Sequence, residues 1–230
     1  MLYLTINENT MNRRLLIQLI AFSLIILTSC NENPTKNSLT KMTLTGKVKA
    51  VNETFYQAEE RFGEAIERSP LRSRTYEFDL QGNLVKDSRF DWGGNLERVE
   101  VHKYDEHGND IDFSMYNAEG NLLFKEICQY DANGNCVVAT RFNEDKIMFE
   151  RTEHTYDESN QLILIKEFNA QDSLVFEGPQ RKIPRAIGFE DYAPVYGDFK
   201  YDDRGNWVRS VISIQQKVRE IAHRNITYYY

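Results

Sequence analysis

The stretch from Tyr104 to Leu122 reads YDEHGNDIDFSMYNAEGNL and contains one phrase twice: an aromatic residue, Asp or Asn, two variable residues, then Gly-Asn. An Asp or Asn at the first turn position bonds its own backbone two residues on, and Gly tolerates the left-handed conformation that ends such a turn. The phrase therefore predicts a type I turn followed by a glycine bulge, a common connection between the strands of a β-hairpin.

The phrase recurs at regular intervals along the chain. The aromatic residues that open its copies, called anchors below, are spaced alternately 12 and 14 residues apart, which makes a 26-residue repeat of two unlike halves. The anchors are Phe78, Phe90, Tyr104, Tyr116, Tyr130, Phe142, Tyr156 and Phe168, with a late copy at Tyr201. Internal periods of this size are typical of arrays of supersecondary units, none of which can bury its apolar surface alone.

The segments between the turns have the length of an ordinary strand and are rich in Val, Ile, Leu, Phe, Thr and Tyr. We therefore predict an all-β fold, an elongated antiparallel meander of repeated β-hairpins that forms largely a single sheet. Polar residues such as Arg98, Glu100 and His102 leave neither strand face purely apolar, which favours solvent on both sides. A leucine follows most turns and is expected to lie across from the anchor: Leu84, Leu96, Leu122, Leu162 and Leu174.

Over about residues 76 to 210 the chain resembles the YD-repeat (RHS-like) proteins, whose signature is an aromatic residue, Asp, two variable residues, Gly and Asn at intervals near twenty. The resemblance implies a repeat-built β architecture and says almost nothing about activity. The mixed spacing departs from the signature, as do the eroded copies at Phe142, Tyr156 and Phe168. The chain is too short for the large shell of the RHS toxins.

Residues 1–30 have the features of a bacterial lipoprotein signal peptide. Arg13 and Arg14 form a basic region, and the mostly apolar run Leu15 to Leu27 follows it. Small residues then precede Cys30, which is expected to be lipidated. The alternative is an uncleaved anchor helix, for which the apolar run is short, since a membrane span needs about 20 residues. Translation could start at Met1 or at Met11.

A lipid anchor on Cys30 predicts a membrane-attached protein of the bacterial cell envelope. Residue 31 is Asn and not the Asp that commonly retains lipoproteins in the inner membrane, which favours the outer membrane. Whether the protein faces the periplasm or the outside stays open. Residues 31–40 are polar and include Pro34, which is typical of a flexible tether.

The charge of the mature chain excludes one class of partner. Without residues 1–30 it carries 26 basic and 34 acidic residues, a net charge of −8. Nucleic-acid binders carry a basic footprint, so we expect no nucleic-acid partner.

Residues 41–230 are expected to form one repeat-built β domain. Residues 52–68 could be helical or could form a strand pair that turns near Phe62-Gly63-Glu64, and the strand pair fits the all-β pattern better. The chain is expected to end in a hairpin whose last strand closes one end of the sheet. The oligomeric state cannot be inferred, although exposed edge strands could pair with another chain.

An insertion at residues 177–200 interrupts the repeat. It delays the next anchor by 19 residues and contains three of the five prolines. Such segments are typical of functional loops on a regular scaffold, or of plain connections that cap a sheet. If the insertion is functional, its aromatic residues are the candidate binding residues: Phe189, Tyr192, Tyr196 and Phe199.

The histidines and cysteines show no pattern that predicts a metal or a cofactor. His102, Cys128 and His154 lie 26 residues apart, so successive ones should be roughly 9.6 Å apart, too far to share one zinc ion. Cys128 and Cys136 are expected on diagonal positions, beyond comfortable reach for a disulfide. The acidic turns lack the spacing of a calcium-binding loop.

No known catalytic motif is present, so we do not expect an enzyme. The sequence instead favours non-catalytic binding or scaffolding in the envelope, through a face of the sheet or the insertion. Two alternatives remain. One is a cell-surface carbohydrate-binding module, which requires exposed aromatic residues in the insertion. The other is an enzyme with an unrecognised site, which requires a cleft with converging carboxylates.

Overall fold

The computed structural model describes residues 37–179 and 194–230. Cys30, Phe189 and Tyr192 lie outside these residues. The elements are α2 (Ser38–Lys41), β1 (Val48–Arg61), β2 (Glu64–Phe78), β3 (Leu84–Phe90), β4 (Leu96–Tyr104), β5 (Asp110–Asn117), β6 (Leu122–Tyr130), β7 (Cys136–Phe142), β8 (Met148–Tyr156), β9 (Leu162–Asn169), β10 (Leu174–Gly178), β11 (Val195–Tyr201), β12 (Trp207–Ile214) and β13 (Lys217–Tyr228).

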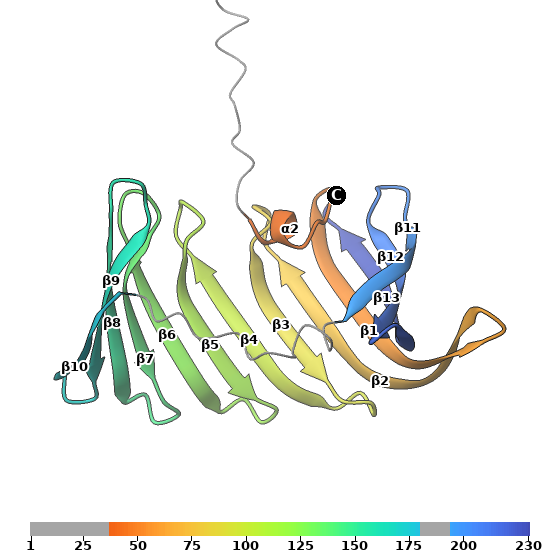
Figure 1. Ribbon diagram of the computed structural model, residues 1–230, viewed down its shortest axis with the longest axis horizontal. Coiled ribbons are helices and arrows are strands. Elements are labelled where there is room, and N and C mark those ends of the chain that lie inside the picture. The colour runs from red at the N-terminus through yellow and green to blue at the C-terminus, as the bar shows by residue number, and fades with distance from the viewer. Residues whose placement is uncertain (1–36, 180–193) are drawn as a thin grey trace, which may run out of the picture. The chain divides into compact units, whose positions relative to one another are not determined.

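The strands form one open antiparallel sheet of 13 strands, ordered β10-β9-β8-β7-β6-β5-β4-β3-β2-β1-β13-β12-β11 (Figure 1). The predicted all-β single-sheet meander is therefore confirmed. The prediction that the last strand closes one end of the sheet is wrong. β13 lies between β1 and β12, and β11 is the edge strand, because pairing between distant segments leaves no local pattern in the sequence.

The turns have the predicted chemistry, as the Asp131 turn illustrates. The Gly134 N–H donates to the Asp131 carbonyl at 3.1 Å, and Gly134 has φ of 78°. One carboxylate oxygen of Asp131 accepts the N–H groups of Asn133 and Asn135, both at 2.9 Å. The other accepts the side-chain amide of Asn135 at 3.0 Å. The Asn after the glycine is therefore explained, because it donates back to the residue that opens the turn.

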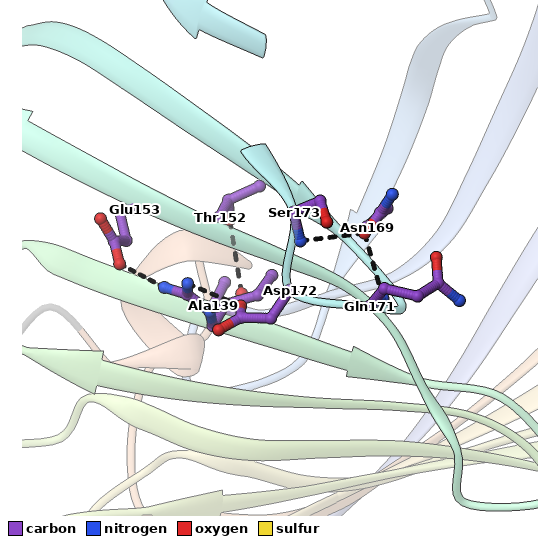
Figure 2. Close-up of polar contacts among 8 residues, drawn as sticks. Ala139, Thr152, Glu153, Asn169, Gln171, Asp172 and Ser173 are labelled. Carbon is purple, nitrogen blue, oxygen red and sulfur yellow. Dashed lines mark hydrogen bonds and ion pairs between the residues drawn. The ribbon is translucent and has the colours of Figure 1, made fainter. Parts of the chain in front are cut away.

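The eroded copies keep the same backbone without the glycine. In the turn that Asn169 opens, the side-chain oxygen accepts the N–H groups of Gln171 and Ser173, both at 3.0 Å (Figure 2). The glycine position is occupied by Lys146, Asn160 and Asp172 in three turns, with φ of 61°, 59° and 56°. The side-chain oxygen at the start of the turn therefore suffices to form it, and the missing glycine leaves backbone strain.

Each anchor lies opposite the residue that follows its turn. This confirms the predicted pairs, which are Phe78↔Leu84, Phe90↔Leu96, Tyr116↔Leu122, Tyr156↔Leu162 and Phe168↔Leu174. The tyrosine anchors of one half-repeat make a second contact that the sequence did not predict. Their hydroxyls donate to the backbone carbonyl 20 residues earlier: Tyr104 to Leu84, Tyr130 to Asp110 and Tyr156 to Cys136.

Residues 52–68 form strands and not a helix. β1 and β2 pair as a long hairpin that turns at Phe62 and Gly63, both of which have positive φ. Gly63 does not break a helix here. It provides the left-handed position that the hairpin turn requires.

The densest packing lies at β1, β2, β12 and β13. Leu39 of α2 and Leu44 pack with Val48, Val51 and Phe78. The side chain of Asn37 caps α2 by accepting the Thr40 N–H. The folded part therefore includes residues 37–40, which the sequence assigned to a tether, because Leu39 covers apolar side chains at the end of the sheet. No helix within the described ranges is long and apolar enough to cross a membrane.

Strands β4 to β10 are mostly half-buried, and ion pairs join strands along the whole sheet. Asp87 is only 1% exposed and accepts the Arg74 guanidinium at 2.7 Å, and this bond raises the pKa of Arg74. Burying a carboxylate in this way requires such a partner. Three more pairs join neighbouring strands: Arg224–Glu53, Lys125–Asp112 and Arg141–Glu126. The Arg72–Glu220 pair joins β2 to β13 across β1, and the Arg98–Glu100 pair lies within β4.

Candidate functional site

The two candidate binding residues that the structure describes, Tyr196 and Phe199, both lie on the edge strand β11. Their side chains are exposed to 44% and 39%. Tyr201 at the end of β11 is exposed to 60%. An edge strand exposes its outer backbone groups as well as its side chains, so this part of the sheet is accessible to a ligand from two directions.

An irregularity in β11 gathers these aromatic side chains. Successive strand residues normally point to opposite faces, which would separate Tyr196 from Phe199 and Tyr201. The register shifts between Gly197 and Lys200, and Asp198 has φ of 47°. A β-bulge re-aims the side chains beyond it. As a result, Tyr196 and Phe199 both contact the ring of Trp207 in β12.

We call Tyr196, Phe199, Tyr201 and Trp207 the edge aromatic cluster. The ring centroids of Tyr196 and Phe199 lie 6.3 Å and 6.1 Å from that of Trp207. The centroids of Phe199 and Tyr201 are 6.0 Å apart, with planes inclined at 39°. The geometry is that of mutually tilted aromatic pairs, which are stable arrangements. Burial raises the pKa of Tyr196.

Trp207 fixes the cluster to the core. It packs against Phe55, Ile212 and Ala222. The guanidinium of Arg224 lies 3.4 Å from the centre of its ring. Arg224 also donates from Nε to the carboxylate of Glu53 at 3.0 Å, and these two side chains are only 9% and 5% exposed. One face of the indole is thus held by a nearly buried ion pair, so the cluster is preorganised.

A hollow of about 510 Å³ lies along the same strands. The hollow is lined by Gly63, Glu64, Ala65, Asp198, Phe199, Lys200, Arg209 and Val211. Tyr196 pairs with Ile212, whereas the neighbouring Gly197 pairs with Val211, so Val211 points to the opposite face of the sheet from Tyr196. The hollow is therefore separate from the edge aromatic cluster.

Sequence reasoning identified Tyr196 and Phe199 and missed Tyr201, Trp207 and Arg224 as parts of the site. A signal for the first two of the missed residues was present. Tyr201 and Trp207 lie opposite each other, in the positions of an anchor and its partner across the turn. A pair with aromatic residues at both positions is unlike the anchor–leucine pairs. Nothing in the sequence indicated Arg224, which reaches Trp207 because β13 lies beside β12.

Several sequence features do not come together. No group of three or more His, Cys, Asp and Glu side chains in the described part of the chain is placed to hold a metal ion. His102 instead contacts Asp110, with 2.6 Å between Nδ1 and Oδ2. His223 contacts Glu67 at 2.7 Å.

Comparisons with known proteins assign no family. No family model and no curated protein matches the chain. A porin-like protein from Bacteroides uniformis is 11% identical, with a TM-score of 0.31, over 78% of this chain and 98% of that one. TcdB2-TccC3-TEV is 14% identical, with a TM-score of 0.25, over 73% of this chain and 11% of that one. A putative outer membrane lipoprotein-sorting protein domain from Vibrio parahaemolyticus is 10% identical, with a TM-score of 0.23, over 79% of this chain and 87% of that one.

Proposed function

We propose that this protein is a non-catalytic binding protein of the bacterial cell envelope, attached through a lipid on Cys30, and that its ligand surface is the edge aromatic cluster. The observation that carries the proposal is the exposure of Tyr196, Phe199 and Tyr201 on an edge strand. These side chains lie beside a tryptophan, Trp207, that packs against the core. Exposed aromatic side chains held rigidly in one patch are typical of binding surfaces, because they lose little conformational entropy when a ligand is bound.

A carbohydrate is the ligand class that these side chains favour. Sugar rings have apolar C–H faces that stack on aromatic rings, and hydroxyl groups that need polar partners at the rim. The edge aromatic cluster offers the rings. The hydroxyl groups of Tyr196 and Tyr201 offer polar partners on exposed side chains of the same cluster. A protein ligand that adds a strand to the free edge of β11 is the second candidate, because β11 is the last strand of the sheet.

The test compares binding by the intact protein and by a variant with both Phe199→Ala and Tyr201→Ala. Both side chains are exposed, so the variant is expected to fold, which circular dichroism checks. The matched control is Trp92→Ala, which removes an aromatic side chain that is 75% exposed in a turn outside the cluster. Each protein is applied to an array of envelope glycans and, separately, incubated with solubilised native envelopes.

The double variant is expected to lose glycan binding by about tenfold or more, while Trp92→Ala binds as the intact protein does. Equal glycan binding by all three proteins would exclude the cluster as the glycan site. If no glycan is bound and a protein from the envelopes is retained by the intact protein only, the strand-edge candidate replaces the carbohydrate.

A further inference from the structure

Two cysteines lie near one end of the β6–β7 hairpin, far along the sheet from β11. Cys128 in β6 lies opposite Ala139, and Cys136 at the start of β7 lies opposite Tyr130. Both side chains are half-buried, and neither forms a disulfide in this structure. Neither residue belongs to the edge aromatic cluster, so a role for the two thiols is independent of the proposed function.

The repeat places the two cysteines at the positions of a contacting pair. The positions that Cys128 and Cys136 occupy correspond to those of His102 and Asp110, 26 residues earlier. In that earlier hairpin the two side chains are in contact, with 2.6 Å between Nδ1 and Oδ2. The two hairpins have the same register, so Cys128 and Cys136 occupy positions from which two side chains can meet. In this structure the Cys128 thiol donates to the carboxylate of Glu126 at 3.7 Å, and the Cys136 thiol donates to the Val138 carbonyl at 3.5 Å. The two cysteines lie on diagonal positions, as the sequence predicts, so a bridge between them requires both side chains to turn toward each other.

The two thiols have different surroundings. The neighbouring Cys128 side chain, together with His154, lowers the pKa of Cys136 to about 7 against the opposing effect of burial. The neighbouring Cys136 side chain and burial raise the pKa of Cys128. Cys136 therefore ionises first. The titratable groups around the pair are Glu126 and Tyr130 from β6, and His154 and Tyr156 from β8.

We propose that Cys128 and Cys136 form a redox-active dithiol, which exchanges with an external disulfide to give an intramolecular disulfide across the β6–β7 hairpin. The chemical partner is a small or protein disulfide, RSSR. Cys136 is the attacking thiolate and Cys128 is the resolving thiol.

The exchange proceeds in two balanced steps. The Cys136 thiolate attacks one sulfur of RSSR, which forms a Cys136–SR bond, breaks the S–S bond of RSSR and releases RS⁻. Cys128 then loses its proton to solvent and attacks the Cys136 sulfur, which forms the Cys128–Cys136 bond and releases a second RS⁻. Two electrons pass from the two cysteines to RSSR, which leaves as two RSH after protonation.

The test uses the full-length protein, purified in detergent under reducing conditions and then incubated with oxidised glutathione. Remaining thiols are alkylated, and the digest is analysed by mass spectrometry without reduction. The expected product has an internal disulfide between Cys128 and Cys136 and is lighter by two hydrogen atoms than the reduced form, with both thiols lost to alkylation. Digestion also separates the sequence that contains these two cysteines from the peptide that contains Cys30.

Two variants test the order of the steps. Cys128→Ser is expected to stop at a glutathione adduct on Cys136, and Cys136→Ser to form an adduct on Cys128 about tenfold more slowly at neutral pH. The proposal is overturned if the intact protein, shown by circular dichroism to stay folded, accumulates only glutathione adducts or retains both thiols. Equal adduct rates in the two variants would overturn the assignment of Cys136 as the attacking thiolate.

Discussion

The hydroxyl of Tyr130 donates a hydrogen bond to the backbone carbonyl of Asp110 at 2.9 Å, and so links an anchor to the strand that begins 20 residues earlier. The contact joins the ends of β6 and β5, on the side where the hairpin turns of this half-repeat lie. Tyr104 and Tyr156 make the equivalent contact. Successive hairpins are therefore connected by side chains as well as by the backbone hydrogen bonds of the sheet.

Replacing Tyr130 by Phe removes this bond and leaves the ring in place. We expect Tyr130→Phe to lower the free energy of unfolding by about 1 kcal/mol, the usual net contribution of one hydrogen bond. Urea titration followed by circular dichroism measures the change. The control is Tyr116→Phe, because the hydroxyl of Tyr116 has no hydrogen-bond partner among the residues that the structure describes, and it should change stability little. An equal loss of unfolding free energy in the two variants would show that the hydrogen bond of Tyr130 adds no stability of its own.

Lys146 occupies a glycine position with φ of 61°, which an L-residue adopts at a cost. Lys146→Gly should therefore raise the free energy of unfolding by roughly 0.5 kcal/mol, the strain relieved less the extra entropy of glycine in the unfolded chain. Asp145→Gly, one residue earlier, should lower it, since no positive φ is relieved there. A shift of the urea midpoint in the same direction for both variants would contradict the strain explanation.

The Asp-Asn turns should make the protein sensitive to acid. The side-chain amide and the backbone N–H of Asn135 hold the pKa of Asp131 below its ordinary value of 3.8. Because the folded-state pKa is the lower one, this carboxylate stabilises the fold above pH 3.8, and its contribution disappears as the pH falls through the folded-state pKa.

Asp131→Asn should accordingly weaken the fall in stability on acidification. The chain already uses Asn at this position in the turns that begin at Asn117, Asn143 and Asn169, so the substitution is compatible with the turn. Urea midpoints measured from neutral pH down to about pH 2 provide the check. An unchanged acid slope would mean that other carboxylates dominate it.

The Arg224–Glu53 pair should be the most sensitive point of the edge aromatic cluster. Arg224→Ala leaves the Glu53 carboxylate, which is only 5% exposed, without a counter-ion and with the Tyr76 hydroxyl as its remaining donor among the described residues, so we expect a loss of about 3 kcal/mol. It also uncovers one face of Trp207. In a Trp92→Phe background, Trp207 is the remaining tryptophan, and its fluorescence should report the change. Arg61→Ala, which breaks an exposed pair with Glu59, should cost far less.

Turn chemistry is local, and for that reason the sequence was sufficient to predict the hairpins, their register at the anchors and the single sheet. The place of β13 was not predictable, because Glu53 and Arg224 meet across 171 residues of chain and no periodicity records that pairing. Two of the four residues of the edge aromatic cluster were predicted. Tyr196 and Phe199 were recognised as aromatic residues in an insertion, but the bulge at Asp198 that aligns them is a backbone feature without a sequence signature.

The cysteines show the same limit at a smaller scale. Simple alternation would place Cys128 opposite Val138. The register shift between Gln129 and Tyr130 places it opposite Ala139 instead. One extra residue in a strand changes which side chains meet, and the sequence pattern alone does not locate that residue.

The position of β1 has a consequence for how the chain is made. β1 precedes every other described strand, yet it lies inside the sheet between β2 and β13. During synthesis, one edge of β1 stays without a partner until residues 217–228 have emerged, long after β2 to β10 can pair in order. Over that interval the nascent protein exposes a free strand edge, the feature most prone to mispairing with other chains. The last strand to be made therefore protects the first.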